Sequence, residues 1–485
     1  MSKHGFEFGE RQPPVDFSRD IPLTSQSTRN PFDTPQQEPV PRRSSKSYFP
    51  SPSLRPEDSS TSIRTSNPEK YGGSFDENGK HRFKSYRLRG EYEKSWVKDP
   101  KMRKGRIGNW VLRVFVIIGF ALCAYINYYA YAGVAKHEYC LVFEDNFQTL
   151  DKNVWQSQVQ IDGFGTGSFD WTTTDSKNAY VDEMGLHIVP TLTNETTKFT
   201  NEQIYHGTNL NLTKLEGDGS CTSTATISCA IRSNSTLGTM IPPVRSARLI
   251  TKGKKTIKYG RVEVTAKLPV GDWLWPAIWM MPEKSVYGEW PRSGEIDIME
   301  SRGNGYNYPE GGKDWYTSTL HWGPSWANDR YWKTTYGRNL RRSDFTKEFN
   351  TFGLEWSEDY IFTYLNSRLV QTLYTGFKKD LTMWKLGEFE NGVAENKTLL
   401  ANPWANTTTH NAPFDQDFYL ILNVAVGARN GWFLDKKGNK TWLDAGASAQ
   451  WDFYREAGTW LPTWGEGDKR GMTVKSVKMW QQGKC

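Results

Sequence analysis

Residues 290–300 read Trp-Pro-Arg-Ser-Gly-Glu-Ile-Asp-Ile-Met-Glu, and this stretch decides the expected fold. Its acidic residues alternate with apolar ones, which is typical of a strand that buries one face in a core and lines a cleft with the other. Glu295 and Asp297 share a strand face, but strict alternation would turn Glu300 to the opposite one. A β-bulge over residues 298–299 would return Glu300 to the acidic face.

Three carboxylates on one strand face favour catalysis, and a solvated acidic edge strand is the alternative. Like charges held close together push pKa values apart, so that one carboxyl group stays protonated while another stays ionised. Such a pair is the minimum requirement for cleaving a glycosidic bond. Glu295 and Glu300 stand about four strand steps apart, roughly 13 Å along the backbone. Long side chains leaning inward would narrow the carboxyl separation to the roughly 5–5.5 Å typical of a retaining enzyme.

The chain is rich in tryptophan, with 21 residues. Indole rings stack on the C–H-rich faces of sugars and tolerate a partly wet site. Trp275 and Trp290 each precede a proline at an expected strand end, where cleft walls are built. They are therefore candidate sugar contacts, whereas Trp279 lies in an apolar run and is expected in the core. For any single tryptophan, core packing is the alternative.

The acidic motif and its surroundings resemble glycoside hydrolase family 16, in particular the laminarinase-like branch that also includes β-1,3-glucan recognition proteins. The resemblance rests on residues 294–300 and on the Trp-Pro pairs at 275–276 and 290–291. Further matching segments follow in the expected order within residues 140–485, at 143–147, 259–269, 320–323, 352–356 and 422–427.

This resemblance implies an all-β fold, an antiparallel concanavalin-like jelly roll, and a retaining endo-acting hydrolase of β-1,3-glucan or mixed β-glucan. It implies that Glu295 is the nucleophile, that Glu300 is the general acid and later the general base, and that Asp297 tunes the protonation of both. Glucan-recognition relatives without hydrolytic activity have these glutamates replaced, so the three acids here favour catalysis. A glucan transglycosylase and a non-catalytic glucan-binding or wall-biogenesis protein are the alternatives.

The resemblance also implies contacts with a β-glucan substrate. The residues expected to make them are Trp275, Trp290, Arg292, His321, Trp322, Asn423 and Trp432. A purely structural role is the alternative for His321. Residues 167–172 and 426–432 depart from the family pattern, which leaves the exact glucan open. No cofactor is expected. Family members sometimes carry a structural calcium ion, but no motif of paired metal ligands occurs in this sequence.

Short strand signals fill the C-terminal part of the chain. Apolar and polar residues alternate over 262–266, and Asn366-Ser367 separates two apolar segments as a hairpin would. Residues 418–426 form a continuous apolar run, and Val474, Val477 and Met479 suit a last strand. No long amphipathic helix is expected there. The pattern supports the antiparallel jelly roll.

The first 108 residues are rich in Pro, Ser, Arg and Lys and lack apolar runs. Such a segment cannot bury enough apolar surface to offset its chain entropy, so residues 1–108 are expected to be a disordered cytosolic tail. The formal net charge of +7 owes part of its value to this tail and does not indicate nucleic-acid binding.

Residues 114–134 carry no charge and are long enough to cross a bilayer as a helix. Basic residues precede this segment, and the positive-inside rule then leaves the tail in the cytosol. We expect a type II signal anchor over residues 109–134 and an extracytoplasmic, monomeric hydrolase domain over 135–485, in the secretory pathway or plasma membrane. A buried core helix is the alternative. The family resemblance, taken together with this anchor, implies a membrane-tethered glucanase of a walled eukaryote such as a fungus.

Glycosylation sequons support this topology, because all six lie after the apolar segment, at Asn194, Asn211, Asn234, Asn396, Asn406 and Asn439. The cysteines outside that segment are even in number, as in an oxidising compartment. They allow three pairings. We favour Cys221 with Cys229, which closes a short loop, and Cys140 with Cys485, which would join the two ends of the domain.

Overall fold

The computed structural model describes residues 93–133, 136–393 and 398–485. The described residues divide into two units, with the boundary after residue 134. Three features of the predictions lie outside the described residues: residues 1–92 of the expected tail (1–108), the last residue of the expected anchor, Val134, and the sequon at Asn396.

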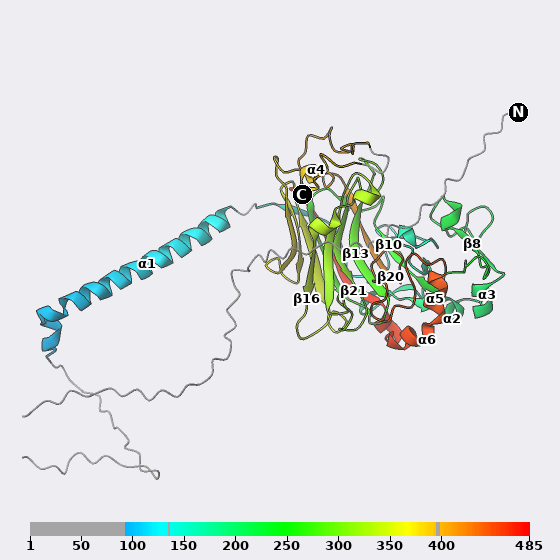
Figure 1. The fold of residues 1–485 in the computed structure, drawn as a ribbon, viewed down its shortest axis with the longest axis horizontal. Coiled ribbons are helices and arrows are strands. Elements are labelled where there is room, and N and C mark those ends of the chain that lie inside the picture. Colours follow the sequence, from blue (N-terminus) through cyan, green and yellow to red (C-terminus); the bar gives the residue numbers. More distant parts are fainter. Residues whose placement is uncertain (1–92, 134–135, 394–397) are drawn as a thin grey trace, which may run out of the picture. The chain divides into compact units, whose positions relative to one another are not determined.

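The first unit contains one long helix, α1 (Arg103–Ala132), shown in Figure 1. Two 3₁₀ turns precede it, Ser95–Lys98 and Pro100–Met102. The helix begins before the predicted start at residue 109, because the intervening Arg and Lys residues are good helix formers. The span Pro100–Ala132 is long and apolar enough to cross a membrane, with a mean hydropathy of 2.0. No residue of α1 is buried within this unit.

The second unit is built on two eight-stranded antiparallel sheets. In spatial order the first sheet contains β19 (Gln371–Gly376), β18 (Tyr360–Leu365), β17 (Asn350–Trp356), β12 (Gly260–Lys267), β21 (Met472–Gln482), β5 (Gly185–Ile188) and β4 (Ala179–Asp182), with β1 (Tyr139–Asp145) paired to β21. The second sheet contains β16 (Thr335–Asn339), β15 (Trp315–His321), β14 (Glu295–Ser301), β13 (Leu274–Pro282), β20 (Phe418–Val426), β10 (Arg248–Ile250) and β2 (Gln156–Ser157), with β11 (Thr256–Ile257) paired to β20.

The two sheets share one hydrophobic core, which confirms the predicted sandwich. Val262 and Val264 from the first sheet and Ile296 and Ile298 from the second belong to the same buried cluster. Buried and half-buried residues alternate along all of β12, as the sequence predicted. Burying two apolar faces against each other stabilises both sheets, because neither could cover its apolar face alone.

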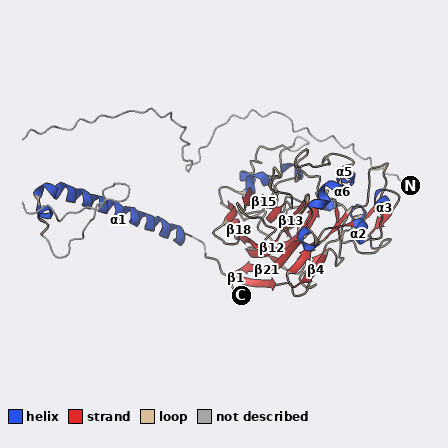
Figure 2. Ribbon diagram, turned by 90° about the horizontal axis from the view of Figure 1, so that it is seen from below, coloured by secondary structure: helices blue, strands red, loops and turns tan. Residues whose placement is uncertain are grey.

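Small elements lie around the sandwich, and Figure 2 shows the short helices outside the strands. The helices are α2 (Thr193–Thr196), α3 (Asn201–Tyr205), α4 (Met383–Leu386), α5 (Ala449–Arg455) and α6 (Ala457–Trp460). The small strands are β3 (Asp170–Thr172), β9 (Val244–Ser246) and β6 (Thr191–Leu192) in one sheet, and β7 (Asn209–Asn211) and β8 (Ala230–Arg232) in another. The pair β3–β9 is parallel.

The predicted hairpin between β18 and β19 is present, but its turn is longer than expected. The second strand begins only at Gln371, and Leu369 in the turn is 94% exposed. Backbone N–H groups of Leu365 and Val370 close the turn by donating to Val370 O and Ser367 O, respectively. Asn366 adopts a left-handed conformation with φ of 60°, which asparagine tolerates better than most residues.

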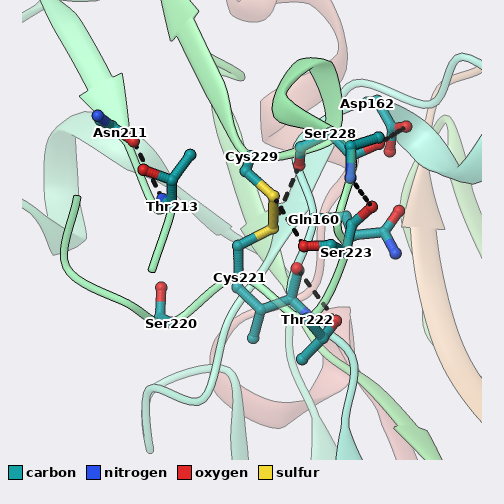
Figure 3. The surroundings of a disulfide bond; sticks show 12 residues. Gln160, Asp162, Asn211, Thr213, Ser220, Cys221, Thr222, Ser223, Ser228 and Cys229 are labelled. Carbon is teal, nitrogen blue, oxygen red and sulfur yellow. Dashed lines mark hydrogen bonds between the residues drawn. A yellow bond between two sulfur atoms is a disulfide. The ribbon is translucent and has the colours of Figure 1, made fainter. Parts of the chain in front are cut away.

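The structure contains both disulfides that we favoured. Cys140 in β1 joins Cys485 across a sequence separation of 345 residues and ties the two ends of the second unit together. Cys221 joins Cys229 across a separation of 8 residues, in the loop region shown in Figure 3. Beside it, the Ser228 hydroxyl donates to Asp162 over 2.6 Å, which attaches this loop to the sandwich.

Candidate active site

The predicted bulge in β14 is present and gathers the three acids on one face. Asp297 pairs with Thr319 and Glu300 pairs with Thr317, so residues 298–299 together face a single residue of β15. Both of these bulged residues are buried in the core. A strand with two consecutive inward residues restores the outward direction of the next one, which here is Glu300.

Each glutamate accepts a hydrogen bond from an indole N–H. Trp290 Nε1 donates to Glu295 Oε2 over 2.7 Å, and Trp275 Nε1 donates to Glu300 Oε1 over 3.1 Å. Both glutamates remain partly exposed, whereas the carboxylate of Asp297 is buried. A ligand arriving from solvent can therefore contact both glutamates on the acid-bearing face.

His321 lies beside the acids and is held by a second carboxylate. Its Nε2 is 3.4 Å from Asp297 Oδ2, and its Nδ1 is 2.5 Å from Asp329 Oδ2. Asp329 also accepts the backbone N–H groups of Trp322 and Tyr331 over 3.1 and 3.2 Å. Burial disfavours a charged imidazole, but the hydrogen bonds to both aspartates and the charge of Glu295 outweigh it, so the pKa of His321 lies well above its usual value.

The three acids have raised pKa values because each is largely removed from water and lies close to other acids. Burial raises the pKa of Glu300 to about 7, against the opposing charge of His321. Burial also raises the pKa values of Glu295 and Asp297, and each of these two gains a further rise from a neighbouring acid. Carboxyl oxygens of Glu295 and Asp297 lie within 4.8 Å of each other, so ionising one of these acids disfavours ionising the other. The group can thus hold and release protons near neutral pH.

Trp275 is buried against Trp432 and cannot act as an open sugar platform. It is only 8% exposed, and its ring lies nearly parallel to that of Trp432, with 4.9 Å between centroids and 14° between planes. The guanidinium of Arg302 lies 3.8 Å from the Trp432 ring centroid. The same guanidinium donates through Nε and Nη2 to Trp432 O, over 3.1 and 2.8 Å, and through Nη1 to Glu310 O over 2.7 Å.

Arg302 follows β14 directly, so the strand that bears Glu300 also holds the segment that bears Trp432. This arrangement fixes Trp275, whose N–H contacts Glu300. From the sequence, Trp275 and Trp432 were expected to contact substrate. In the structure Trp275 donates to Glu300 and Trp432 packs against Trp275, so both residues orient Glu300. The sequence did not single out Arg302, because an arginine after an acidic strand has no motif of its own.

The other expected contact residues occupy different positions. Trp290 is 37% exposed beside Glu295, and Arg292 is exposed and donates to Pro324 O over 2.7 Å. Asn423 on β20 is half-buried and accepts Trp279 Nε1 over 2.7 Å. Trp322 is fully buried and donates to Thr334 Oγ1 over 2.8 Å, so the expectation that it touches substrate is wrong for this structure.

Trp279 corrects the expectation that it lies in the core. It pairs with Asp297 across the ladder and therefore points to the acid-bearing face. There it packs against a small cluster of Ile250, Tyr419 and Ile421, separate from the main core. The apolar run around it suggested burial on both faces, but one face of β13 meets the ligand side of the sheet.

Arg248 on β10 is a residue of this face that the sequence did not reveal. Its guanidinium lies between the rings of Phe164 and Trp279, 4.1 and 4.6 Å from their centroids. Burial lowers its pKa to about 10, and the charge of Glu295 opposes that change. Its Nε has no hydrogen-bond partner among the described residues. A buried donor without a partner is costly, so this one is available to an oxygen-rich ligand.

Among the residues that the structure describes, two groups of side chains offer ligand atoms close enough together to hold a metal ion. Glu295, Asp297 and His321 offer ligand atoms within 4.8 Å of one another, as do Asp182 and His187 of the first sheet together with Asp468 of the 3₁₀ turn Gly467–Arg470. A protonated imidazole cannot ligate, and both nitrogens of His321 already face carboxylates. The site is therefore better described as a proton-holding group than as a metal centre.

Comparisons with known proteins identify related chains. The family model described as glycosyl hydrolases family 16 matches residues 166–385. A β-1,3-glucan-binding protein of Penaeus monodon is 37% identical over 348 residues, which are 70% of this chain and 90% of the relative. A glucan endo-1,3-β-glucosidase of Cryptopygus antarcticus is 38% identical over 183 residues, which are 38% of this chain and 55% of that relative. The laminarinase structure from Rhodothermus marinus is 22% identical, covers 72% of this chain and 100% of its own, and has a TM-score of 0.43.

Proposed function

Because this chain belongs to glycosyl hydrolases family 16, we propose that its second unit hydrolyses β-1,3-linked or mixed β-glucan with retention of configuration. The observation that carries the proposal is the bulged strand, which turns Glu295, Asp297 and Glu300 to one face. A protein that only binds glucan has no need of three interacting acids, since burying like charges is unfavourable.

The reaction proceeds in two displacements. In the first, Glu295 attacks the anomeric carbon, and Glu300 gives its proton to the oxygen of the departing sugar. In the second, Glu300 takes a proton from water, whose oxygen attacks the same carbon and releases Glu295. A pKa of about 7 allows Glu300 to serve as acid and then as base near neutral pH.

Glu295 must be ionised when it attacks. Burial and the charge of Asp297 raise the pKa of Glu295 to about 8, so Glu295 has to lose its proton before it attacks. Protonated His321 and the indole N–H of Trp290 favour the ionised form of Glu295. On the same face, Arg248 and Asn423 offer polar groups to sugar hydroxyls, and Trp290 offers an exposed ring.

The test compares the full chain, purified in detergent, with its Glu295→Gln variant on laminarin, with products followed by mass. We expect cleavage by the first and a loss of about a thousandfold or more in the second, because the variant lacks the nucleophile. Glu358→Gln is the matched control, since Glu358 is exposed at a turn of the first sheet. Equal rates for the wild-type chain and the Glu295→Gln variant would refute the proposal.

Two alternative functions, glucan transglycosylase and glucan-binding protein, would give products different from those of hydrolysis. A transglycosylase would form longer chains without new reducing ends, because a second glucan replaces water in the second step. A glucan-binding protein would bind laminarin without changing it, and the Penaeus monodon relative bears such a name. The same assay separates the three, since only hydrolysis raises the number of reducing ends.

We also infer a single-pass type II topology, with a cytosolic N-terminal region, α1 in the membrane and residues 135–485 outside the cytosol as a glycosylated domain acting on cell-wall polysaccharide. The two disulfides and the apolar α1 support this inference. Asn406 and Asn439 are exposed, and Asn194, Asn211 and Asn234 are half-buried. Enzymatic removal of N-glycans should increase the mobility of the chain on a gel. In sealed membrane vesicles whose cytosolic face is outside, added protease should leave the glycosylated domain intact. A chain without glycans would contradict the topology.

A further inference from the structure

The loop between β15 and β16, residues 322–334, presents three large aromatic side chains to solvent. Trp326 is 76% exposed, Trp332 is 54% exposed and Tyr331 is 45% exposed. We call these three residues the aromatic ridge. Leaving such rings in water is unfavourable, and a group of them close to a site usually marks an interaction surface.

The ridge adjoins the acid-bearing face. The Tyr331 ring stacks on that of His321, with 5.3 Å between centroids and 29° between planes. Asp329 holds both residues, because it accepts the backbone N–H of Tyr331 and contacts His321 Nδ1. Trp332 packs edge-on against Tyr331 at 5.6 Å. A ligand that lies across the acids toward β15 would therefore meet the ridge next.

The cations near the ridge already have partners. Arg330 donates to Gly387 O over 3.1 Å and lies 5.0 Å from the ring centroid of Trp332. Lys333 pairs with Glu388 over 2.7 Å. The ridge thus offers aromatic faces rather than free charge, which suits the C–H-rich faces of neutral sugar rings and does not suit an anionic ligand.

We propose that the aromatic ridge binds the continuation of the glucan chain beyond the acids, on the side of β15 and β16. The ridge would then give the protein a preference for long polymer over short oligosaccharide. This inference rests on the proposed function for the identity of the sugar, but it concerns binding and can be measured without turnover.

The test uses the full chain in detergent with Glu295→Gln as the background, so that no substrate is consumed. Trp326→Ala and Trp332→Ala are introduced together, and affinity is measured for laminarin and for laminaritriose. We expect binding of laminarin to weaken about tenfold or more, because two stacking faces are lost, while binding of laminaritriose stays the same. Both rings are exposed, so their removal should leave the fold intact.

Tyr374→Ala is the control, because Tyr374 is 57% exposed on the first sheet, away from the acids. The proposal would be overturned by any of three results. The double variant could bind laminarin as tightly as the Glu295→Gln background, the background could show no measurable laminarin binding, or Tyr374→Ala could lose as much affinity as the double variant. The proposal would also be overturned if the double variant lost affinity for lipid vesicles but kept its affinity for laminarin. That result would assign the aromatic ridge to binding a membrane surface. The wild-type chain could prove inactive while the double variant still loses laminarin affinity. That result would refute the proposed hydrolase function and support the proposal that the aromatic ridge binds glucan.

Discussion

Trp275 donates its indole N–H to Glu300 Oε1 over 3.1 Å, and this bond favours the ionised form of the glutamate. Trp275→Phe removes the donor while keeping an aromatic ring. We expect the pKa of Glu300 to rise above about 7, so the alkaline limb of the profile of kcat/KM against pH should move to higher pH. A profile that moves to lower pH, or does not move, would contradict this assignment.

Glu300 should also make stability depend on pH. Its pKa in the folded chain, about 7, lies above the ordinary value of 4.5, so the protonated form stabilises the fold. That contribution is fully present below pH 4.5 and is lost as pH rises through about 7. In Glu300→Gln the loss should be smaller by on the order of 1–3 kcal/mol between pH 5 and pH 8. Urea unfolding at the two pH values measures the difference, and equal losses in both proteins would refute it.

Arg302 should be needed both for stability and for the protonation of Glu300. Arg302→Met leaves the carbonyls of Trp432 and Glu310 without their donors, and we expect a loss of about 2–4 kcal/mol in unfolding free energy. It also removes a positive charge that lowers the pKa of Glu300. The alkaline limb of activity should therefore move to higher pH.

Arg302→Lys separates the two effects. Lysine keeps the charge but cannot form the forked contacts of a guanidinium. We expect this variant to lose stability like Arg302→Met while its pH profile stays near that of the wild-type chain. A lysine variant with full stability would show that the fork to Trp432 O is unimportant.

The two disulfides should contribute unequally to stability. In the chain-entropy model, closing a longer loop stabilises more, and the separations are 345 and 8 residues. Replacing Cys140 and Cys485 by serine should cost about 3–5 kcal/mol, whereas replacing Cys221 and Cys229 should cost about 2–3 kcal/mol. Thermal unfolding of the two double variants gives the order. The reverse order would mean that the short loop has a structural role beyond its length, for example through Ser228 and Asp162.

Sequence reasoning recovered much of the fold because the relevant signals are local. Alternation over 262–266 is the direct consequence of a strand with one buried face, and the apolar α1 segment is set by composition alone. The bulge at 298–299 also followed from the sequence, since two adjacent apolar residues interrupt an otherwise regular pattern.

The surroundings of the acids could not be read in the same way. Trp322 was expected to contact substrate but is buried, and Trp279 was expected in the core but lies on the acid-bearing face. The sheet face on which such an aromatic side chain lies is known only when its neighbours in the ladder are known. Arg248 and Asp329 reach the site from β10 and from the loop after β15, and neither carries a local motif.

The sequence by itself determined that a membrane-length helix precedes a β-sandwich, and that three acids share one strand. Those properties depend on the order of apolar and polar residues within a few positions of each other. Only the tertiary structure decided which indole donates to which glutamate, that Arg302 holds Trp432 against Trp275, and that the aromatic ridge adjoins His321. These contacts depend on how the strands pair and how the loops beside them pack, and the bond between Arg302 and Trp432 joins residues 130 positions apart. They therefore exist only once the strands have paired and the two sheets have packed.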